Sequence, residues 1–355
     1  MAGTTRAAID AVLRQGVTEG VYPGAALLVA QGEAVLYSGV AGEAAVVPYR
    51  RPLTLHMHWD IASLTKPVAI ATILLRLVET EGLDLHQTRV AGRFSLWELL
   101  HHTSGLPAWV ALKAVLSPEH LAGDETALRA AVTEGILASG SSSPLARTCY
   151  SDLGFILIGF WLEDHLGARL DRLFDAWVAQ PLGLSHTGYR PLARGIASEQ
   201  IVATQQSPRR GQVQVGEVDD DNAALLGGVA GHAGLFSTVE DVHLWLNDIR
   251  LSLQGKGSLF KRETLRPLLE TRPPFGRFHL GFDTPSAIGS QAGTHFSPQT
   301  IGHLGFTGCS FWLDLKTGWE VIFFTNRVHP DPANDAIKRF RPYLHDAVYR
   351  ICNGS

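Results

Sequence analysis

Hydrophobic and polar positions change period along this chain, and the first change lies close to its start. Apolar residues at helical spacing predict an amphipathic helix over residues 5–18. Strand-like apolar segments then follow over residues 25–30 and 34–39, separated by the turn-forming pair Gln31 and Gly32. The pattern therefore predicts a helix followed by a β-hairpin.

A second hairpin is predicted near the other end of the chain. Residues 310–315 and 320–325 are rich in aromatic and β-branched side chains, and the glycine-containing segment 316–319 between them is turn-like. A helix over residues 335–351 follows. Because both ends contribute a helix and strands, we expect one antiparallel sheet built from the two termini, with helices on its faces.

The middle of the chain has helical signals. Residues 95–98 form a capping box, and residues 155–166 and 170–177 carry helical apolar spacing. A polar stretch over residues 193–221 precedes another capped helix, which begins at Ser237. The prediction is thus an α+β fold in which a helical lobe is inserted into a sheet lobe.

The expected lobes follow from this order. Residues 1–83 and 225–355 would form the sheet lobe, and residues 84–224 the mainly helical lobe with a loop-rich return segment. With 355 residues, 45% hydrophobic content and 18% charged residues, the chain can bury a large core. A net charge of −4 provides no basic surface, so nucleic acid is not an expected partner.

The cellular location is predicted from the lack of export, membrane and disulfide signals in the sequence. Residues 1–15 contain no continuous apolar run of the kind a signal peptide has, and no stretch reaches the roughly 18 apolar residues of a membrane span. Cys149, Cys309 and Cys352 are odd in number and far apart, which argues against a disulfide framework. We therefore expect a cytoplasmic protein with reduced thiols and no membrane span.

The strongest chemical signal is the segment Ser63-Leu64-Thr65-Lys66. Residues three apart share a helix face, so the Lys66 amine can reach the Ser63 hydroxyl and take its proton. The apolar run after Pro67 and the stop at Gly82 predict that this pair lies in the first turn of a helix. The same spacing recurs at Ser258 and Lys261, where a solvated helix start is expected instead.

Two further segments fit the same chemistry. Tyr150-Ser151-Asp152 follows a Gly/Ser/Pro-rich loop over residues 140–144, and a tyrosine there can relay a proton. His303-Leu304-Gly305 comes just before the C-terminal hairpin. The string His-x-Gly occurs at four other places, so only its position ahead of the hairpin is informative.

In this order the motifs resemble those of the penicillin-recognising serine hydrolases, which comprise class C β-lactamases, D,D-peptidases, D-aminopeptidases and related esterases. The segments 99–107, 150–159, 227–238 and 302–314 are also similar to this family. The resemblance implies a β-lactamase/transpeptidase-like fold and no cofactor or metal. It also implies that the third motif lies on the strand before the hairpin, at His303. The Lys-Thr-Gly string at Lys316 lies in the predicted turn and is therefore not assigned as this motif.

Residue roles follow from the resemblance. Ser63 would be the nucleophile, and Lys66 and Tyr150 would move its proton. The N–H groups of Ser63 and Phe306 would hold the oxyanion, and Gly305 would leave room for the backbone. His303 would contact the carboxylate or leaving group of the substrate.

Asp152 departs from the family pattern, which has asparagine there. An ionised carboxylate cannot donate a hydrogen bond, and it would hold Lys66 protonated and raise the pKa of Tyr150. Three alternatives stay open: Asp152 is protonated, it turns away, or Lys66 acts mainly as an electrostatic partner.

Other polar clusters are assigned structural roles. The run 219–221 lacks His or Glu at metal-ligand spacing, so a solvated loop is expected. His101 and His102 lack the His-Glu-x-x-His pattern of zinc hydrolases, and His232 is expected to be structural.

The sequence thus predicts a serine hydrolase that acts through a Ser63 acyl-enzyme on an ester, amide or β-lactam. The expected partner is a small-molecule or peptide-like substrate. Alternatives are a D-aminopeptidase or D,D-carboxypeptidase, or a catalytically silent binding relative. The sequence indicates no oligomeric state.

Overall fold

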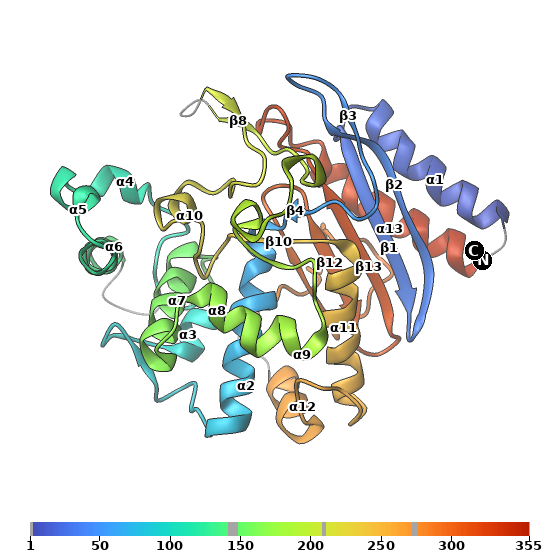
Figure 1. Ribbon diagram of the computed structural model, residues 1–355. Helices are drawn as coiled ribbons and strands as arrows, with labels where there is room; N and C mark the ends of the chain where they lie inside the picture. Colours follow the sequence, from blue (N-terminus) through green and yellow to red (C-terminus); the bar gives the residue numbers. More distant parts are fainter. Residues whose placement is uncertain (1–2, 141–147, 208–210, 272–275, 355) are drawn as a thin grey trace.

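A six-stranded antiparallel sheet forms the centre of the molecule. The computed structural model describes residues 3–140, 148–207, 211–271 and 276–354 (Figure 1). The strands of the sheet are β1 (Gly24–Gln31), β2 (Ala34–Ala45), β3 (Arg51–Pro52), β11 (Thr300–Leu304), β12 (Ser310–Asp314) and β13 (Trp319–Thr325). Their order is β11-β12-β13-β1-β2-β3, so β1 pairs directly with β13. The prediction of a sheet built from both termini is confirmed.

The sheet is covered on both faces. Since successive side chains of a strand point to opposite faces, neighbouring residues of β1 enter two different cores. Leu27 belongs to the core that includes side chains of α1 (Gly3–Thr18) and α13 (Ile337–Asn353). Its neighbour Leu28 belongs to the larger core on the other face, where α11 (Val239–Leu253) packs against β1 and β13. Figure 1 shows α1 and α13 side by side on one face of the sheet.

The hairpin of β12 and β13 is buried along its whole length, as expected for strands covered on both faces. Its turn is held by the Asp314 carboxylate, which accepts the N–H of Lys316 at 2.8 Å and that of Thr317 at 3.3 Å. Gly318 adopts a φ of +70°, which glycine permits at little cost. Lys316 therefore lies in the turn, as predicted.

Helices fill most of residues 84–184. They are α3 (Leu96–Leu100), α4 (Leu112–Val115), α5 (Pro118–Ala122), α6 (Glu125–Ser139), α7 (Asp152–Leu166), α8 (Leu170–Phe174), the π-helical turn η3 (Asp175–Ala179) and α9 (Gln180–Leu182). The predicted capping box is present, since Ser95 Oγ accepts the N–H of Glu98 and the Glu98 carboxylate accepts that of Ser95. The lobe boundaries at 83/84 and 224/225 stay a prediction.

A smaller sheet brings together strands from before and after the long helical part of the chain. It consists of β4 (Trp59–Asp60), β10 (Leu235–Ser237) and β7 (Gly188–Tyr189), in the order β4-β10-β7. The helix predicted to begin at Ser237 instead has Thr238 as its N-cap, and Thr238 Oγ1 accepts the N–H of Asp241 at 3.3 Å. Ser237 remains in β10 because it pairs with Trp59.

Short elements complete the described chain. They are the strand pairs β5 (Arg89–Val90) with β6 (Phe94–Ser95) and β8 (Gln206–Ser207) with β9 (Gln212–Val213), the 3₁₀ turns η4 (Pro191–Arg194) and η5 (Ser198–Gln200), and the helices α10 (Asp221–Leu225) and α12 (Arg262–Glu270). The predicted loop over residues 140–144 lies outside the described residues except for Gly140. Within the described ranges, no helix has both the length and the apolar character needed to cross a membrane.

Candidate active site

Ser63 lies in a sharp turn that follows β4. The turn is the 3₁₀ segment η1 (Ala62–Leu64), and Ala62 adopts a left-handed φ of +47°. Such a conformation is strained for a residue with a Cβ. The Asp60 carboxylate offsets this strain, because one of its oxygens accepts the Ala62 N–H at 2.8 Å. The backbone that presents Ser63 is therefore fixed from within β4.

The segment after this turn differs from the single helix that the sequence predicts. A π-helical segment, η2 (Lys66–Ala71), leads into α2 (Thr72–Glu81), and α2 ends at Gly82 as expected. The segment is helical, as predicted, but its first turns are 3₁₀ and π turns and not regular α-helix. Ser63 and Lys66 nevertheless share one face, and the Lys66 amine donates to Ser63 Oγ at 2.9 Å.

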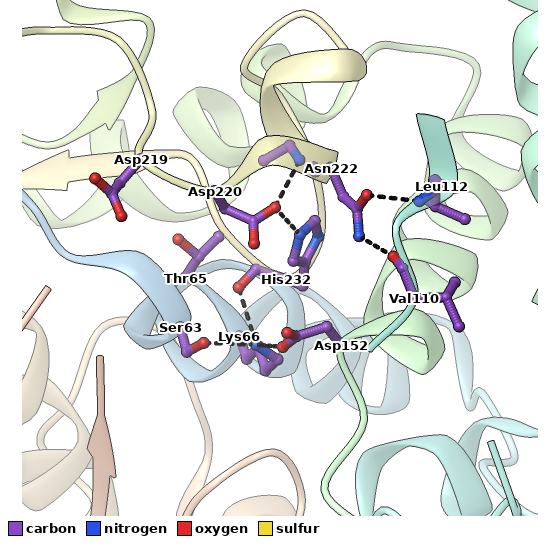
Figure 2. A network of polar contacts seen from close by, with 12 residues as sticks. Ser63, Thr65, Lys66, Val110, Leu112, Asp152, Asp219, Asp220, Asn222 and His232 are labelled. Atoms are coloured by element: carbon purple, nitrogen blue, oxygen red, sulfur yellow. Dashed lines mark hydrogen bonds and ion pairs between the residues drawn. The ribbon is translucent and has the colours of Figure 1, made fainter. Parts of the chain in front are cut away.

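The Lys66 amine is fully buried among polar groups (Figure 2). Besides Ser63 Oγ, it lies 2.7 Å from Asp152 Oδ1 and 3.0 Å from the carbonyl oxygen of His232. Burial lowers the pKa of Lys66, but the charge of Asp152, the Tyr150 phenol and the hydrogen bonds to both residues together outweigh burial, so the pKa lies above its ordinary value. The resting state therefore holds an ammonium group beside Ser63.

Asp152 faces Lys66, so the alternative in which it turns away was wrong. It is the first residue of α7, and its N–H donates to the Ala108 carbonyl at 2.9 Å. Since Asp152 forms an ion pair where the family pattern has an amide, this chain has a charged pair next to its serine.

Tyr150 completes the group around Lys66. The Lys66 amine lies 5.0 Å from the centre of the Tyr150 ring, and the ring of His303 lies 6.1 Å from that of Tyr150. Burial raises the pKa of Tyr150 to about 12, with a further contribution from Asp152 that Lys66 opposes. At neutral pH Tyr150 is therefore a protonated phenol, which can donate a proton but does not act as a base.

The strand β11 brings the third motif against the nucleophile turn. An ideal Cβ on Gly305 would lie 2.8 Å from the carbonyl oxygen of Ile61, a separation that no side chain could occupy without a shift of backbone. Glycine therefore permits the close approach that the sequence predicted. The next residue, Phe306, is 56% exposed and lines the two cavities that Ser63 also lines.

His303 is a neutral hydrogen-bond acceptor in this structure. Its Nδ1 lies 2.9 Å from the Leu304 carbonyl oxygen, which can only accept, so the ring proton is on Nδ1. Nε2 is buried and has no partner among the described residues. Burial, together with the charge of Lys66, lowers the pKa of His303 to about 3. His303 can therefore accept from a leaving group but cannot supply charge to a carboxylate.

Two cavities of opposite charge meet at Ser63. One, of about 370 Å³, is lined by Asp152, Asp219, Asp220 and Asp221 on its polar side. The other, of about 590 Å³, is lined by His303 and has a basic excess, because the cationic side chains of Arg277, Arg327, Lys338 and Arg341 outnumber the carboxylates of Asp152 and Asp283. A substrate bound at Ser63 would thus extend from an acidic region into a basic one.

The acidic run 219–221 is not the solvated loop that the sequence predicts. Asp219 is only 5% exposed, and its N–H donates to Asp60 Oδ2 at 2.7 Å. Asp220 pairs with His232 Nε2 at 2.7 Å, and Asn222 fastens this loop to the backbone at Val110 and Leu112 (Figure 2). The expectation was wrong because these residues are folded back beside the nucleophile turn.

Sequence reasoning missed several residues of this region. Asp60, Arg277, Lys338 and Arg341 come from β4, a loop and α13, and no motif joins them. His232 is buried, as expected for a structural residue, but its carbonyl group contacts Lys66. Within the described residues, no group of three His, Cys, Asp or Glu side chains could hold a metal ion.

The fold and the Ser-x-x-Lys arrangement are those of a serine hydrolase. A family model described as Beta-lactamase matches residues 9–342, and the chain belongs to this family. It is 28% identical to a protein of Escherichia coli O157:H7 named as an assumed D-alanyl-D-alanine carboxypeptidase, over 92% of this chain and 83% of that protein. A Salmonella gallinarum protein of the same name is also 28% identical, over 80% of this chain and 72% of that protein.

Solved structures show the same fold. EstCE1, a hydrolase with promiscuous acyltransferase activity, is similar with a TM-score of 0.71 at 20% identity, over 97% of this chain and 98% of that one. The octameric penicillin-binding protein homologue of Pyrococcus abyssi has a TM-score of 0.70 at 16% identity, over 98% and 77% of the two chains. Simvastatin synthase of Aspergillus terreus has a TM-score of 0.72 at 18% identity, over the whole of both chains.

Proposed function

We propose that this enzyme is a D,D-carboxypeptidase-type hydrolase that removes a C-terminal residue with a free carboxylate through a Ser63 acyl-enzyme. The observation that carries the substrate class is the basic cavity beside Ser63, lined by Arg277, Lys338 and Arg341. Cationic side chains at one end of a cleft favour an anionic group there. The names of the two relatives given above support the same class.

The proposed acylation step begins with the Lys66–Asp152 pair. Ser63 Oγ attacks the scissile carbonyl and gives its proton to Lys66, which passes one of its own to Asp152 Oδ1 over 2.7 Å. The N–H groups of Ser63 and Phe306 receive the oxyanion. Asp152 is thereby neutralised while Lys66 stays an ammonium, so the pair carries a net positive charge as negative charge develops on the substrate.

Collapse of the tetrahedral intermediate needs a proton for the leaving amine. Tyr150 donates its phenolic proton as the C–N bond breaks, and it recovers a proton from Lys66, which takes it back from Asp152. Water then attacks the acyl-enzyme by the same route in reverse. The proton of Ser63 thus ends on the leaving group, and the enzyme is restored after hydrolysis.

The test compares two peptides that both end in D-Ala-D-Ala, one with a free carboxylate and one with a carboxamide. Charge-assisted hydrogen bonds contribute roughly 1.5–3 kcal/mol, so kcat/KM should favour the carboxylate by about tenfold to a hundredfold. Lys338→Met should reduce this preference by up to about fivefold, because Lys338 is 71% exposed and surface ion pairs are weak. Lys316→Met, in the distant β12–β13 turn, is the matched control.

A second candidate, hydrolysis of neutral esters, is favoured by one observation. His303 is neutral and its Nε2 can only accept, so the third motif supplies no charge for a carboxylate. Rapid turnover of short esters, together with equal rates on the carboxylate and carboxamide peptides, would select this candidate. It would also place recognition of the substrate in the apolar part of the cavity, at Phe278 and Ile337.

A further inference from the structure

Tyr150 is positioned without the help of a helix or strand. Residues 148–151 form an irregular segment, and α7 begins only at Asp152. A proton relay must be held in place to about 1 Å, because a misplacement of that size can cost about a hundredfold in rate. Contacts outside the segment must therefore fix the orientation of Tyr150.

Three of those contacts come from one residue, His102. Its carbonyl oxygen accepts the N–H of Cys149 at 2.9 Å, and its Nδ1 accepts the N–H of Ser151, also at 2.9 Å. His102 thus binds the backbone on each side of Tyr150. Its ring also packs on the Tyr150 ring, with centroids 4.6 Å apart and an interplanar angle of 34°.

The chemistry of His102 suits this arrangement. Because Nδ1 accepts from a backbone N–H, the imidazole is neutral and carries its proton on Nε2. Full burial keeps the pKa of His102 well below its ordinary value, and the positive charge of Lys66 acts in the same direction. The ring therefore stays an acceptor across neutral pH.

The backbone of His102 is strained. Its φ of +56° lies in the left-handed region, which is uncommon for residues other than glycine and asparagine. The strained conformation turns the His102 carbonyl and ring toward the Cys149–Ser151 backbone. Two further hydrogen bonds hold the backbone after Tyr150: Ser151 Oγ donates to Pro107 O at 2.7 Å, and Asp152 N donates to Ala108 O at 2.9 Å.

We propose that His102 is a positioning residue that holds the Tyr150 hydroxyl in line for proton donation to the leaving group. This inference rests on the relay role given to Tyr150 under the proposed function. It also assigns a role to the segment 99–107, which the sequence marked as similar to the family without a function. His102 acts through Tyr150 and does not itself touch the reacting atoms.

Esters with different leaving groups separate this role from a merely structural one. A methyl ester needs its leaving alkoxide protonated, whereas a 4-nitrophenyl ester with the same acyl group hardly does. His102→Phe keeps a ring but lacks the acceptor, and kcat on the methyl ester should fall about tenfold or more while the aryl ester is little affected. Rates are expressed per active site, counted by fluorophosphonate labelling, so that loss of folded protein cannot mimic the effect.

Two further variants sharpen the test. His102→Asn keeps an oxygen acceptor and tolerates the left-handed backbone, so it should retain more of the methyl-ester rate than His102→Phe. His101→Asn is the matched control, because His101 is equally buried but bonds to Trp97 O and His279 instead. It should leave the ratio of methyl-ester to aryl-ester rates unchanged.

A double-mutant cycle with Tyr150→Phe decides the outcome. If His102 acts through Tyr150, adding His102→Phe to Tyr150→Phe should cost less than about twofold more. Fully additive losses, or an unchanged ester ratio in His102→Phe, would overturn the inference while the Tyr150 relay stands. If Tyr150→Phe itself leaves the ratio unchanged, the relay of the proposed function fails, and the His102 inference fails with it. Should His102→Phe not fold, His102→Leu, which also lacks the acceptor, carries the same outcomes.

Discussion

Lys66 Nζ lies closer to the carboxylate of Asp152, at 2.7 Å, than to the hydroxyl of Ser63, at 2.9 Å. A lysine that bonds only to the serine and to an amide can lose its proton on burial, because desolvation penalises the ammonium. Here the anion, with the Tyr150 phenol, reverses that balance and raises the pKa of Lys66. The base of this enzyme is therefore best regarded as the pair of residues and not as the amine alone.

Asp152→Asn should change the shape of the pH profile. In wild type the ion pair accepts the Ser63 proton, so kcat/KM is expected to be flat from about pH 6 to 9. In the variant a free amine is required, so activity should rise with pH through the pKa of Lys66, which falls once the charge of Asp152 no longer opposes burial. Asp219→Asn, a change of the same kind in the same cavity, should keep the flat profile. Parallel profiles for wild type and Asp152→Asn would exclude Asp152 from the base.

Ser63→Ala should abolish covalent labelling by a fluorophosphonate, read as the mass increase of the intact protein. Loss of a hydroxyl in a tight turn removes little packing, so the Tm is expected to change by only a few degrees. Ser258→Ala is the control, since Ser258 and Lys261 repeat the spacing of the motif in the loop before α12. Labelling that survives Ser63→Ala would place the nucleophile elsewhere.

Gly305→Ala tests the contact between β11 and the nucleophile turn. The new Cβ would meet Ile61 O at 2.8 Å, and Ala62 Cβ at 3.4 Å, so the turn and the strand must separate. Overpacking of this kind costs about 1–3 kcal/mol, and displacement of the oxyanion donors should lower kcat by about a hundredfold. Gly135→Ala, whose Cβ would find only an ordinary contact at 3.5 Å, should raise the Tm slightly and leave kcat unchanged.

Asp60→Asn should alter how stability depends on pH. Burial, and then the neighbouring Asp219, raise the pKa of Asp60 to about 7 in the folded protein. A carboxyl whose folded pKa is raised contributes stability that is present below its unfolded pKa, near 3.8, and is lost as pH rises toward 7. The wild-type Tm minus the variant Tm should therefore decrease between pH 4 and 7.5. A difference that stays constant over this range would show that Asp60 does not titrate there.

Local signals account for what the sequence predicted well. The hairpins, the capping box at Ser95 and the Ser63–Lys66 spacing each depend on residues only a few positions apart, and such contacts leave a periodic or motif-like trace. The 3₁₀ and π turns around Ser63 were missed because propensity over residues 63–81 favours a continuous α-helix, whereas the Asp60 carboxylate stabilises the tighter turn.

Long-range contacts account for the rest. Asp60 and Asp219 are 159 positions apart, and His303 and Arg341 reach the same cavity from β11 and α13. Nothing in the neighbourhood of Asp219 distinguishes a carboxylate that folds back beside Ser63 from one in solvent. The charge of the substrate cavity therefore became visible only with the tertiary structure.

The pairing of β1 with β13 also bears on how the protein is made. Thr325 lies opposite Ala25, so the central strand has to wait on the ribosome for a partner synthesised about 300 residues later. Until then the β1–β2 hairpin presents an open edge, and the nucleophile turn exists without the Gly305 backbone that completes the site. A chain interrupted before residue 300 would thus expose unpaired strand edges without a complete site at Ser63, and synthesis of β11 to β13 would allow folding and activity to appear together.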